Sequence, residues 1–170
     1  MQPSVDFDPE FADPIDVIRQ ERTWQRHFCD ELERLADQLG GPLDTNLCTT
    51  LNTQLQSKLP LYHRDEEALF ELMRQKEPEN EVLAACTAVA ISQHVAMQTF
   101  VFELQEPLGD VTVGVALGNP DTVGYMLRYC FDGIRHHLKW EDASIFRGQS
   151  QHFPTADMEQ LRQEMIRNRL

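Results

Sequence analysis

Four long segments of this chain place apolar residues three or four positions apart, the spacing that gives an α-helix one apolar face. They cover approximately residues 13–39, 45–76, 80–107 and 119–145, and a shorter amphipathic segment begins at Thr155. An apolar helix face is stable only when other elements cover it, and short links make neighbouring long helices antiparallel. These segments predict an all-α fold, an antiparallel up-down-up-down four-helix bundle with a short C-terminal helix.

The remaining stretches set the expected boundaries of that bundle. Residues 1–12 have no helical period and predict an N-terminal arm, which leaves residues 13–170 as one bundle domain. Pro60 lies inside the second segment, where its missing amide hydrogen predicts a kink. Residues 108–118 lack a helical stripe and predict a long connection, and residues 148–154 predict a loop before the last helix.

The balance of charge excludes several classes of partner. The chain has 15 Lys and Arg against 28 Asp and Glu, a net charge of −13, whereas non-specific binding to nucleic acid or to an anionic membrane needs surplus basic residues. No apolar run approaches the roughly 18–20 residues that span a bilayer, and the acidic N-terminus lacks the basic start of a signal peptide. The four cysteines are widely spaced, which favours reduced thiols. We therefore expect a cytoplasmic protein that binds neither nucleic acid nor a membrane.

Two of the predicted helices carry a histidine and a glutamate four residues apart, which places both side chains on one helix face. The pairs are His63 with Glu67 and His137 with Glu141, and His94 stands in the middle of the apolar face of the third helix. In an antiparallel hairpin, two residues at one height are equally distant from the turn. The midpoints between His63 and His94, and between His94 and His137, fall in the links that join their helices. Three helices are thus predicted to bring inward histidines to one level.

Imidazole and carboxylate side chains together suit iron, zinc or manganese. Two buried glutamates without a counter-charge would be costly, and bound metal ions would supply that charge. For one His-x-x-x-Glu pair alone, a hydrogen-bonded network in the core or a solvent-facing helix surface is the simpler interpretation. The gathering of five such groups near one level favours a metal site in the bundle core.

These residues resemble the hemerythrin-like family of His-His-Glu cation-binding bundles, and the resemblance extends over about residues 13–170. It rests on three motifs, which are His63-x-x-x-Glu67 followed by Leu69-Phe70, His94, and His137-x-x-x-Glu141 followed by Ile145-Phe146. The resemblance implies a non-haem di-iron centre in which Glu67 and Glu141 bridge the irons and the three histidines complete their coordination. Members of the family bind or react with dioxygen, nitric oxide or peroxide, and others take part in iron homeostasis or in the repair of iron–sulfur centres.

The first helix departs from the family pattern. The family usually has a histidine there, and Arg22 stands in its place at the height of His63. His27, the one histidine of this helix, lies about 7 Å too far along it and points to another side. Because a guanidinium stays protonated and has no lone pair to offer, Arg22 cannot ligate a metal. Glu21 is a possible additional carboxylate ligand near that position, although a solvated side chain is the favoured interpretation.

Three outcomes are open for such a site. It could hold two irons, one of them under-ligated and open to a small molecule. It could hold one metal, with Arg22 replacing the charge of the other by pairing with Glu67 or Glu141. It could also be vestigial and hold no metal.

We predict a protein with one or two non-haem iron ions, with zinc or manganese as alternative metals. It would bind or sense dioxygen, nitric oxide or peroxide, or handle iron under oxidative or nitrosative stress. An enzyme is the first alternative, either a di-iron oxidase, a peroxidase or an iron–sulfur repair factor, but the sequence shows no separate nucleophile or proton relay. A metal-free helical interaction module is the second alternative, and the oligomeric state is not determined by the sequence.

Overall fold

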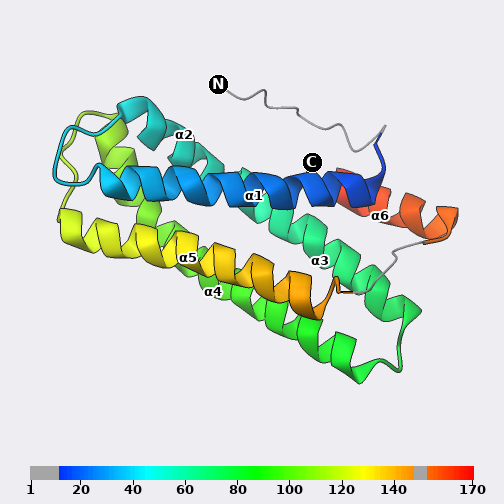
Figure 1. The fold of residues 1–170 in the computed structure, drawn as a ribbon. Coiled ribbons are helices and arrows are strands. Elements are labelled where there is room, and N and C mark those ends of the chain that lie inside the picture. Colours follow the sequence, from blue (N-terminus) through cyan, green and yellow to red (C-terminus); the bar gives the residue numbers. More distant parts are fainter. Residues whose placement is uncertain (1–11, 148–152) are drawn as a thin grey trace.

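The computed structural model describes residues 12–147 and 153–170, and every regular element within these two ranges is a helix. The helices are α1 (Pro14–Asp37), α2 (Thr45–Gln56), α3 (Lys58–Lys76), α4 (Glu81–Thr112), α5 (Pro120–Ser144) and α6 (Thr155–Arg167). Four legs, formed by α1, by α2 with α3, by α4 and by α5, run in alternating directions, and α6 lies against α3 and α1 (Figure 1). The predicted all-α, up-down-up-down bundle with a short C-terminal helix is confirmed. The predicted N-terminal arm, apart from Ala12, and most of the predicted loop before α6 lie outside the described residues.

Side-chain caps explain where the legs begin. The Asp13 carboxylate accepts a hydrogen bond from the Ile15 amide at 2.9 Å, and Pro14 occupies the first turn, where its lack of an amide hydrogen costs nothing. Asn80 and Asn119 cap α4 and α5 in the same way. Each cap satisfies an amide that helix geometry leaves unpaired, and each contributes roughly 1 kcal/mol of helix stability.

The second leg breaks where the sequence predicted a kink. α2 ends at Gln56, Ser57 adopts φ −120° and ψ −57°, and α3 starts at Lys58. Pro60 has no amide hydrogen to donate to the Gln56 carbonyl, and its ring crowds that carbonyl, so the ladder of helical hydrogen bonds is interrupted there. Because of the break, the rotation of α3 about its axis is not a continuation of that of α2. This rotation determines which side chains of α3 face the bundle interior.

The third leg is longer than predicted. The expected end near Pro107 is wrong, because α4 continues to Thr112 with Pro107 inside it, and the expected connection over 108–118 is correspondingly shorter. A proline removes one helical hydrogen bond, but Leu108 and Val111 beyond it are buried in the core and hold the last turns in place.

One helix has the composition of a membrane span. By length and composition alone, α4 could cross a membrane, so the expectation that no apolar run approaches that length does not hold for this helix. Its inward side chains Leu83, Met97 and Leu104 are buried against the rest of the bundle. Val95 and Phe102 are nevertheless well exposed, so part of the outer side of this apolar helix is uncovered.

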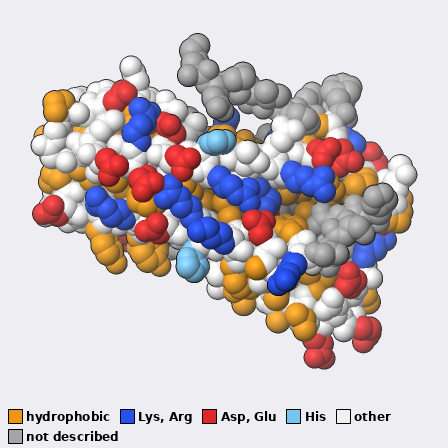
Figure 2. Space-filling model, viewed as in Figure 1, with side chains coloured by type: hydrophobic (Ala, Val, Ile, Leu, Met, Phe, Trp, Pro, Cys, Tyr) orange, Lys and Arg blue, Asp and Glu red, His pale blue; other side chains and the backbone are white. Residues whose placement is uncertain are grey.

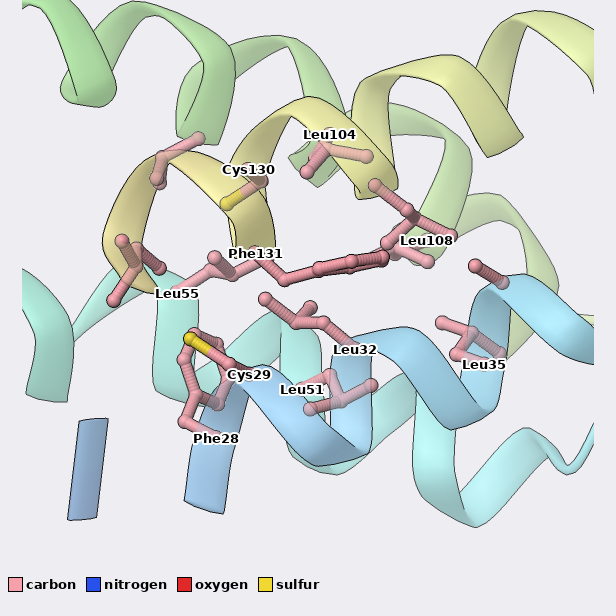
Figure 3. Close-up of a cluster of buried hydrophobic side chains, with 14 of the residues drawn as sticks. Phe28, Cys29, Leu32, Leu35, Leu51, Leu55, Leu104, Leu108, Cys130 and Phe131 are labelled. Atoms are coloured by element: carbon pink, nitrogen blue, oxygen red, sulfur yellow. The ribbon is translucent and has the colours of Figure 1, made fainter. Parts of the chain in front are cut away.

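Two clusters of buried apolar side chains lie toward the two ends of the bundle. The larger one joins α1, α2, α4 and α5, with Leu32, Leu51 and Phe131 among its members (Figure 3). Full burial of each such side chain contributes roughly 1.5–3 kcal/mol. Along α1 and α4, the polar residues Arg22 and His94 fall between the segments that build the two clusters. The candidate site is therefore enclosed between two dry, closely packed regions.

Candidate metal centre

Three helices bring three histidine rings into contact. His63 of α3 stacks on His94 of α4 with ring centroids 4.0 Å apart and an angle of 4° between their planes. His137 of α5 lies edge-on to His94, with centroids 4.6 Å apart. All three side chains are buried. The structure thus gathers the histidines that the equal-height argument pointed to.

The glutamate of α3 that enters the site is Glu66. One donor atom each from Glu66, His94, His137 and Glu141 lie within 4.8 Å of one another, and all four residues are buried. Among the described residues, these four are close enough to one another to bind a single metal ion. Glu67, which the sequence analysis placed inside, is instead about one-third exposed at the edge of the site.

Helix geometry explains the difference between these two neighbours. Leu59, Glu66 and Met73 recur at seven-residue intervals, and all three are buried on the face of α3 that meets the core. Glu67 follows Glu66 by one residue and therefore points about 100° away. The heptad spacing from Leu59 to Met73 is the signal in the sequence that could have identified Glu66.

Hydrogen bonds at the outer edge of the site orient the two imidazole rings. His94 Nδ1 lies 2.9 Å from Glu67 Oε1, and His137 Nδ1 lies 2.7 Å from Gln93 Oε1. Carboxylate and amide oxygens accept hydrogen bonds, so each Nδ1 is the protonated nitrogen and each Nε2 carries a lone pair. Such outer partners orient the histidine ligands of metal sites in the same manner.

The two Nε2 atoms then face one another at 2.9 Å. Burial is the larger cause and the neighbouring His137 the smaller cause that lower the pKa of His94 to about 3. Burial also lowers the pKa of His63 far below its usual value. In the tautomer that donates from Nδ1 to Glu67 or Gln93, each ring has no hydrogen on its Nε2, so no hydrogen lies between the two Nε2 atoms. Two lone pairs at this separation repel, and a cation between them would remove the repulsion.

Three other donor atoms lack a hydrogen bond. His63 Nε2, Glu66 Oε2 and Glu141 Oε1 are buried, and no hydrogen bond reaches them. Glu141 Oε1 lies 3.1 Å from His137 Nε2, and Glu66 Oε2 lies 3.6 Å from His94 Nε2. A buried polar atom without a partner costs roughly 1–3 kcal/mol, and more when it is charged. A metal ion bound among these atoms would satisfy them together, so the donor set fits a cation.

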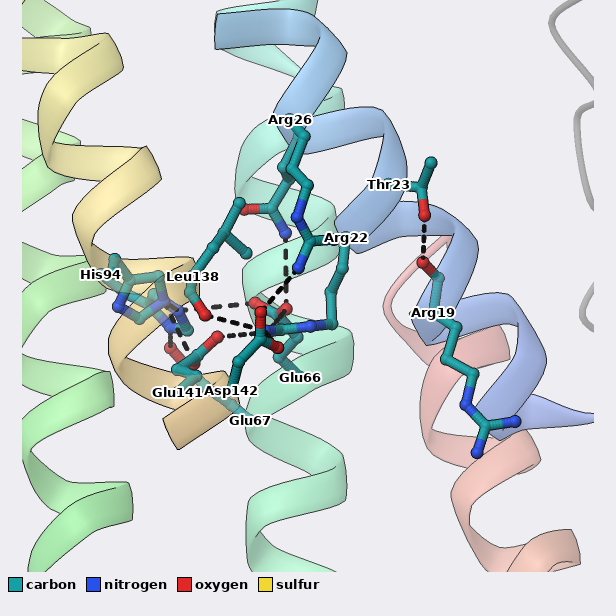
Figure 4. Close-up of polar contacts among 12 residues, drawn as sticks. Arg19, Arg22, Thr23, Arg26, Glu66, Glu67, His94, Leu138, Glu141 and Asp142 are labelled. Atoms are coloured by element: carbon teal, nitrogen blue, oxygen red, sulfur yellow. Dashed lines mark hydrogen bonds and ion pairs between the residues drawn. The ribbon is translucent and has the colours of Figure 1, made fainter. Parts of the chain in front are cut away.

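Arg22 of α1 occupies the opposite side of the two glutamates (Figure 4). Its Nη1 donates to Glu66 Oε1 at 2.8 Å and also to Glu141 Oε2. Its Nη2 donates to Asp142 Oδ1 at 2.8 Å and to the Leu138 carbonyl at 3.3 Å. The guanidinium is buried, as are both of the glutamates that it contacts.

The charges of this cluster support one another. Burial alone would lower the pKa of Arg22, but Glu66 and Glu141 outweigh it and raise that pKa above its usual value. Burial would raise the pKa of Glu141, but His137 and Arg22 together hold it below its usual value. Burial and the adjacent Glu141 raise the pKa of Glu66 to about 7, although Arg22 opposes the shift.

The two remaining residues singled out in α1 lie outside this cluster. His27 is exposed on the surface of α1 and does not reach the site. The expected solvated side chain of Glu21 is wrong, because Glu21 is buried. It faces the C-terminus of the chain, where Arg169 Nη2 donates to its Oε1 at 2.8 Å. Burial and the nearby Asp65 raise the pKa of Glu21 to about 10, because their effect exceeds the opposite effect of Arg169.

A buried cluster of imidazole and carboxylate groups inside an antiparallel helical bundle defines a class of protein, the bundles that hold cations between their helices. The chain matches the family model described as hemerythrin HHE cation binding domain over residues 13–148. That match covers most of the chain, which therefore belongs to the hemerythrin HHE cation-binding family. No curated protein and no solved structure was found to match it.

Proposed function

We propose that this protein binds non-haem iron between α3, α4 and α5, and that the bound iron takes up a small ligand such as dioxygen, nitric oxide or peroxide. The observation that carries the proposal is the set of buried donor atoms without hydrogen bonds, grouped around two Nε2 atoms that face one another. Membership of a cation-binding family supports the same conclusion. Glu66, His94, His137 and Glu141 would hold the ion, and His63 Nε2 is a further donor beside them.

The residues around the site would have separate roles in metal and ligand binding. Iron would supply the coordination chemistry that small diatomic and peroxide ligands need. Glu67 and Gln93 hold the two rings so that their Nε2 atoms present lone pairs to the ion. The apolar clusters on either side exclude bulk water from the buried donors. This arrangement suits a carrier, a sensor or a protein that handles iron under oxidative or nitrosative stress.

Metal analysis tests the first part of the proposal. Protein purified without oxygen and loaded with Fe(II) is expected to retain iron after gel filtration. His94→Ala and His137→Ala should lose it, because each change removes a ligand. His27→Ala is the matched control, because His27 is exposed and distant from the cluster. Absence of iron, zinc and manganese above trace in the loaded wild type would contradict the proposal and favour a metal-free interaction module.

Ligand addition tests the second part. Nitric oxide added anaerobically to the Fe(II)-loaded protein should change its visible absorption spectrum, and dioxygen should change it when admitted instead. Protein that retains iron but shows no spectral change with nitric oxide, dioxygen or peroxide would contradict a ligand-binding role while leaving iron storage or transfer standing.

We also propose that the protein works in a reducing, cytoplasmic compartment. All four of its cysteines are free thiols, and three of them are buried. Free buried thiols are typical of proteins from reducing compartments. Cell fractionation should recover the protein with the cytoplasmic contents, and recovery from an oxidising compartment would contradict this assignment.

A further inference from the structure

Each glutamate of the site divides its two oxygens between two neighbours. Glu66 gives Oε1 to Arg22 and turns Oε2 toward His94. Glu141 gives Oε2 to Arg22 and turns Oε1 toward His137. Both carboxylates therefore bridge the guanidinium on one side and the histidine-lined space on the other (Figure 4).

From this division we infer that Arg22 takes the place of a second metal ion and that the site holds one metal ion per chain. The inference rests on the proposed metal binding. A bridging carboxylate needs a positive partner at each of its oxygens, and Arg22 already supplies that partner to Glu66 and Glu141. Only one oxygen of each glutamate is left for a metal.

Arg22 is also held too firmly to be displaced by an ion. Its second nitrogen donates to Asp142 and to the Leu138 carbonyl, and its guanidinium carbon lies 4.5 Å from the centre of the Phe146 ring. These contacts come from three directions around a planar group, which fixes its position. A guanidinium also cannot lose its proton to make room for a metal.

The charges beside Arg22 disfavour a second dication. Among the buried groups, Glu66 and Glu141 contribute two negative charges and Arg22 contributes one positive charge, while the half-exposed Asp142 is shared between Arg22 and Arg26. One dication already exceeds the remaining negative charge of the two glutamates, and a second dication would add two further buried positive charges. The charges and the division of the oxygens therefore both favour one ion.

Counting metal ions in the wild type and in variants of Arg22 tests the inference. Chains loaded anaerobically with Fe(II), and separately with Mn(II), are freed of unbound ion and analysed by mass spectrometry. The wild type should hold one ion per chain. Arg22→His should hold two, and Arg22→Lys should hold one because the positive charge remains. Arg26→His is the control, since Arg26 contacts Asp142 at the surface of the cluster, and it should hold one.

The outcomes separate the two proposals. Two ions in the wild type would overturn the inference and leave metal binding intact. No ion in the wild type would overturn the proposed function, and the inference with it. One ion in both the wild type and a folded Arg22→His variant would show that Arg22 does not set the count, which also overturns the inference. If Arg22→His does not fold, the wild-type count still tests the prediction of one ion per chain.

A different observation concerns the outer face of α4. No charged residue lies between Glu81 and Glu103. Three large apolar side chains on this stretch are well exposed, Val82 at 72%, Val95 at 67% and Phe102 at 72%. Orange side chains gather along the lower edge of the molecule in Figure 2, over α4 and the start of α5. A charge-free apolar face of this kind on a strongly acidic chain marks an interaction surface.

We propose that this face pairs with the same face of a second copy of the chain. Two chains that each carry a net charge of −13 repel one another. The face of α4 is a surface on which they can meet without bringing like charges together. The residues that flank the face are acidic, Glu79 and Glu81 at one end and Glu103 and Glu106 at the other, which disfavours an anionic membrane as the occupant. A pair of α4 helices crossing near the middle of the face would keep these acidic ends apart.

The size of the face agrees with a dimer. The charge-free stretch is about 30 Å long, and α4 with the adjoining α5 is about 20 Å wide. Tyr129 of α5 extends the surface, since its ring stacks on Phe100 of α4 with centroids 3.9 Å apart, and Tyr125 lies beside it. These dimensions set an upper limit of roughly 600 Å² for the face, which is at the low end of what each partner buries in a specific interface.

The mass of the protein in solution tests this proposal. Sedimentation equilibrium across micromolar concentrations should give a dimer for the wild type and a monomer for Val95→Glu, which places a charge at an exposed point of the face. Thr23→Glu, on the exposed surface of α1, is the control and should remain dimeric. A monomeric wild type at 100 µM, or a dimer unaffected by Val95→Glu, would overturn the proposal. Co-sedimentation with neutral phosphatidylcholine vesicles, abolished by Val95→Glu, would also overturn it and identify a membrane as the occupant.

Discussion

Removing the charge of Arg22 should destabilise the metal-free protein strongly, and added metal should restore much of the loss. In Arg22→Met the side chain keeps much of its length but leaves Glu66 and Glu141 buried without a cation. Breaking one side of a fully buried ion pair costs about 3–5 kcal/mol. Neither Arg22 nor the two glutamates is exposed enough for solvent to screen the interaction. For a chain of this size, that loss corresponds to a fall in Tm of about 6–20 °C.

The assay is urea unfolding of chelator-treated protein, repeated with an excess of Mn(II). A metal present at about 100 times its Kd stabilises a one-site protein by about 2.7 kcal/mol. Arg22→Met should regain more than this, because its unpaired glutamates gain a cation. Arg26→Met is the control, since Arg26 is half-exposed and pairs only with the half-exposed Asp142 among the described contacts, and it should change stability by less than about 1 kcal/mol. A loss below about 1 kcal/mol in Arg22→Met, or equal stabilisation of the wild type and this variant by Mn(II), would refute the reasoning.

Three further changes test separate parts of the structure. Glu21 has a folded pKa of about 10, above its unfolded value, so the folded state retains a proton that the unfolded state has lost. The resulting stability is complete at low pH and declines as pH rises toward 10, by at most about 1.4 kcal/mol per pH unit. Glu21→Gln should remove that decline in urea titrations between pH 5 and 9, where Asp65, Arg169 and Glu66 are the charged groups around it, and an unchanged slope would contradict the assignment. Glu67→Ala should weaken Mn(II) binding about 10–100-fold in calorimetry by freeing the His94 ring, with no effect expected from the exposed Glu71→Ala; equal affinities would deny Glu67 that role. Leu104→Ala, in the larger core cluster, should cost about 2–5 kcal/mol in urea unfolding, and a loss under 1 kcal/mol would indicate a less closely packed core.

Much of the fold could be predicted because its determinants are local. Apolar spacing, the caps at Asp13, Asn80 and Asn119, and the glycines after α1 define the legs without reference to the rest of the chain. The two prolines behaved differently for reasons that lie in tertiary structure. Pro60 broke its helix, whereas Pro107 was tolerated because buried residues on both sides hold α4 against the core.

The candidate site was predictable in position but not in every member. Heights along a bundle follow from residue numbers, so His63, His94 and His137 could be brought together from the sequence. The choice between Glu66 and Glu67 depends on a helix rotation of about 100°. The seven-residue spacing of Leu59, Glu66 and Met73 contains that information, whereas the His63-x-x-x-Glu67 motif taken alone does not.

Arg22 shows a second limit of sequence reasoning. Its height opposite the histidines could be anticipated, because it stands where a histidine usually lies. Its division of the oxygens of Glu66 and Glu141 could not, because that arrangement depends on rotamers fixed by Asp142 and Phe146. The chemical role of Arg22, which departs from the family pattern, therefore follows only from its three-dimensional contacts.

The most direct test of the account is a crystal structure of the protein soaked anaerobically with Mn(II), with the ion located by its anomalous scattering. The account predicts one peak per chain, about 2.0–2.3 Å from His94 Nε2 and His137 Nε2. Arg22 should still contact Glu66 and Glu141 in that structure. No peak at the histidines, or two peaks with Arg22 displaced, would contradict it.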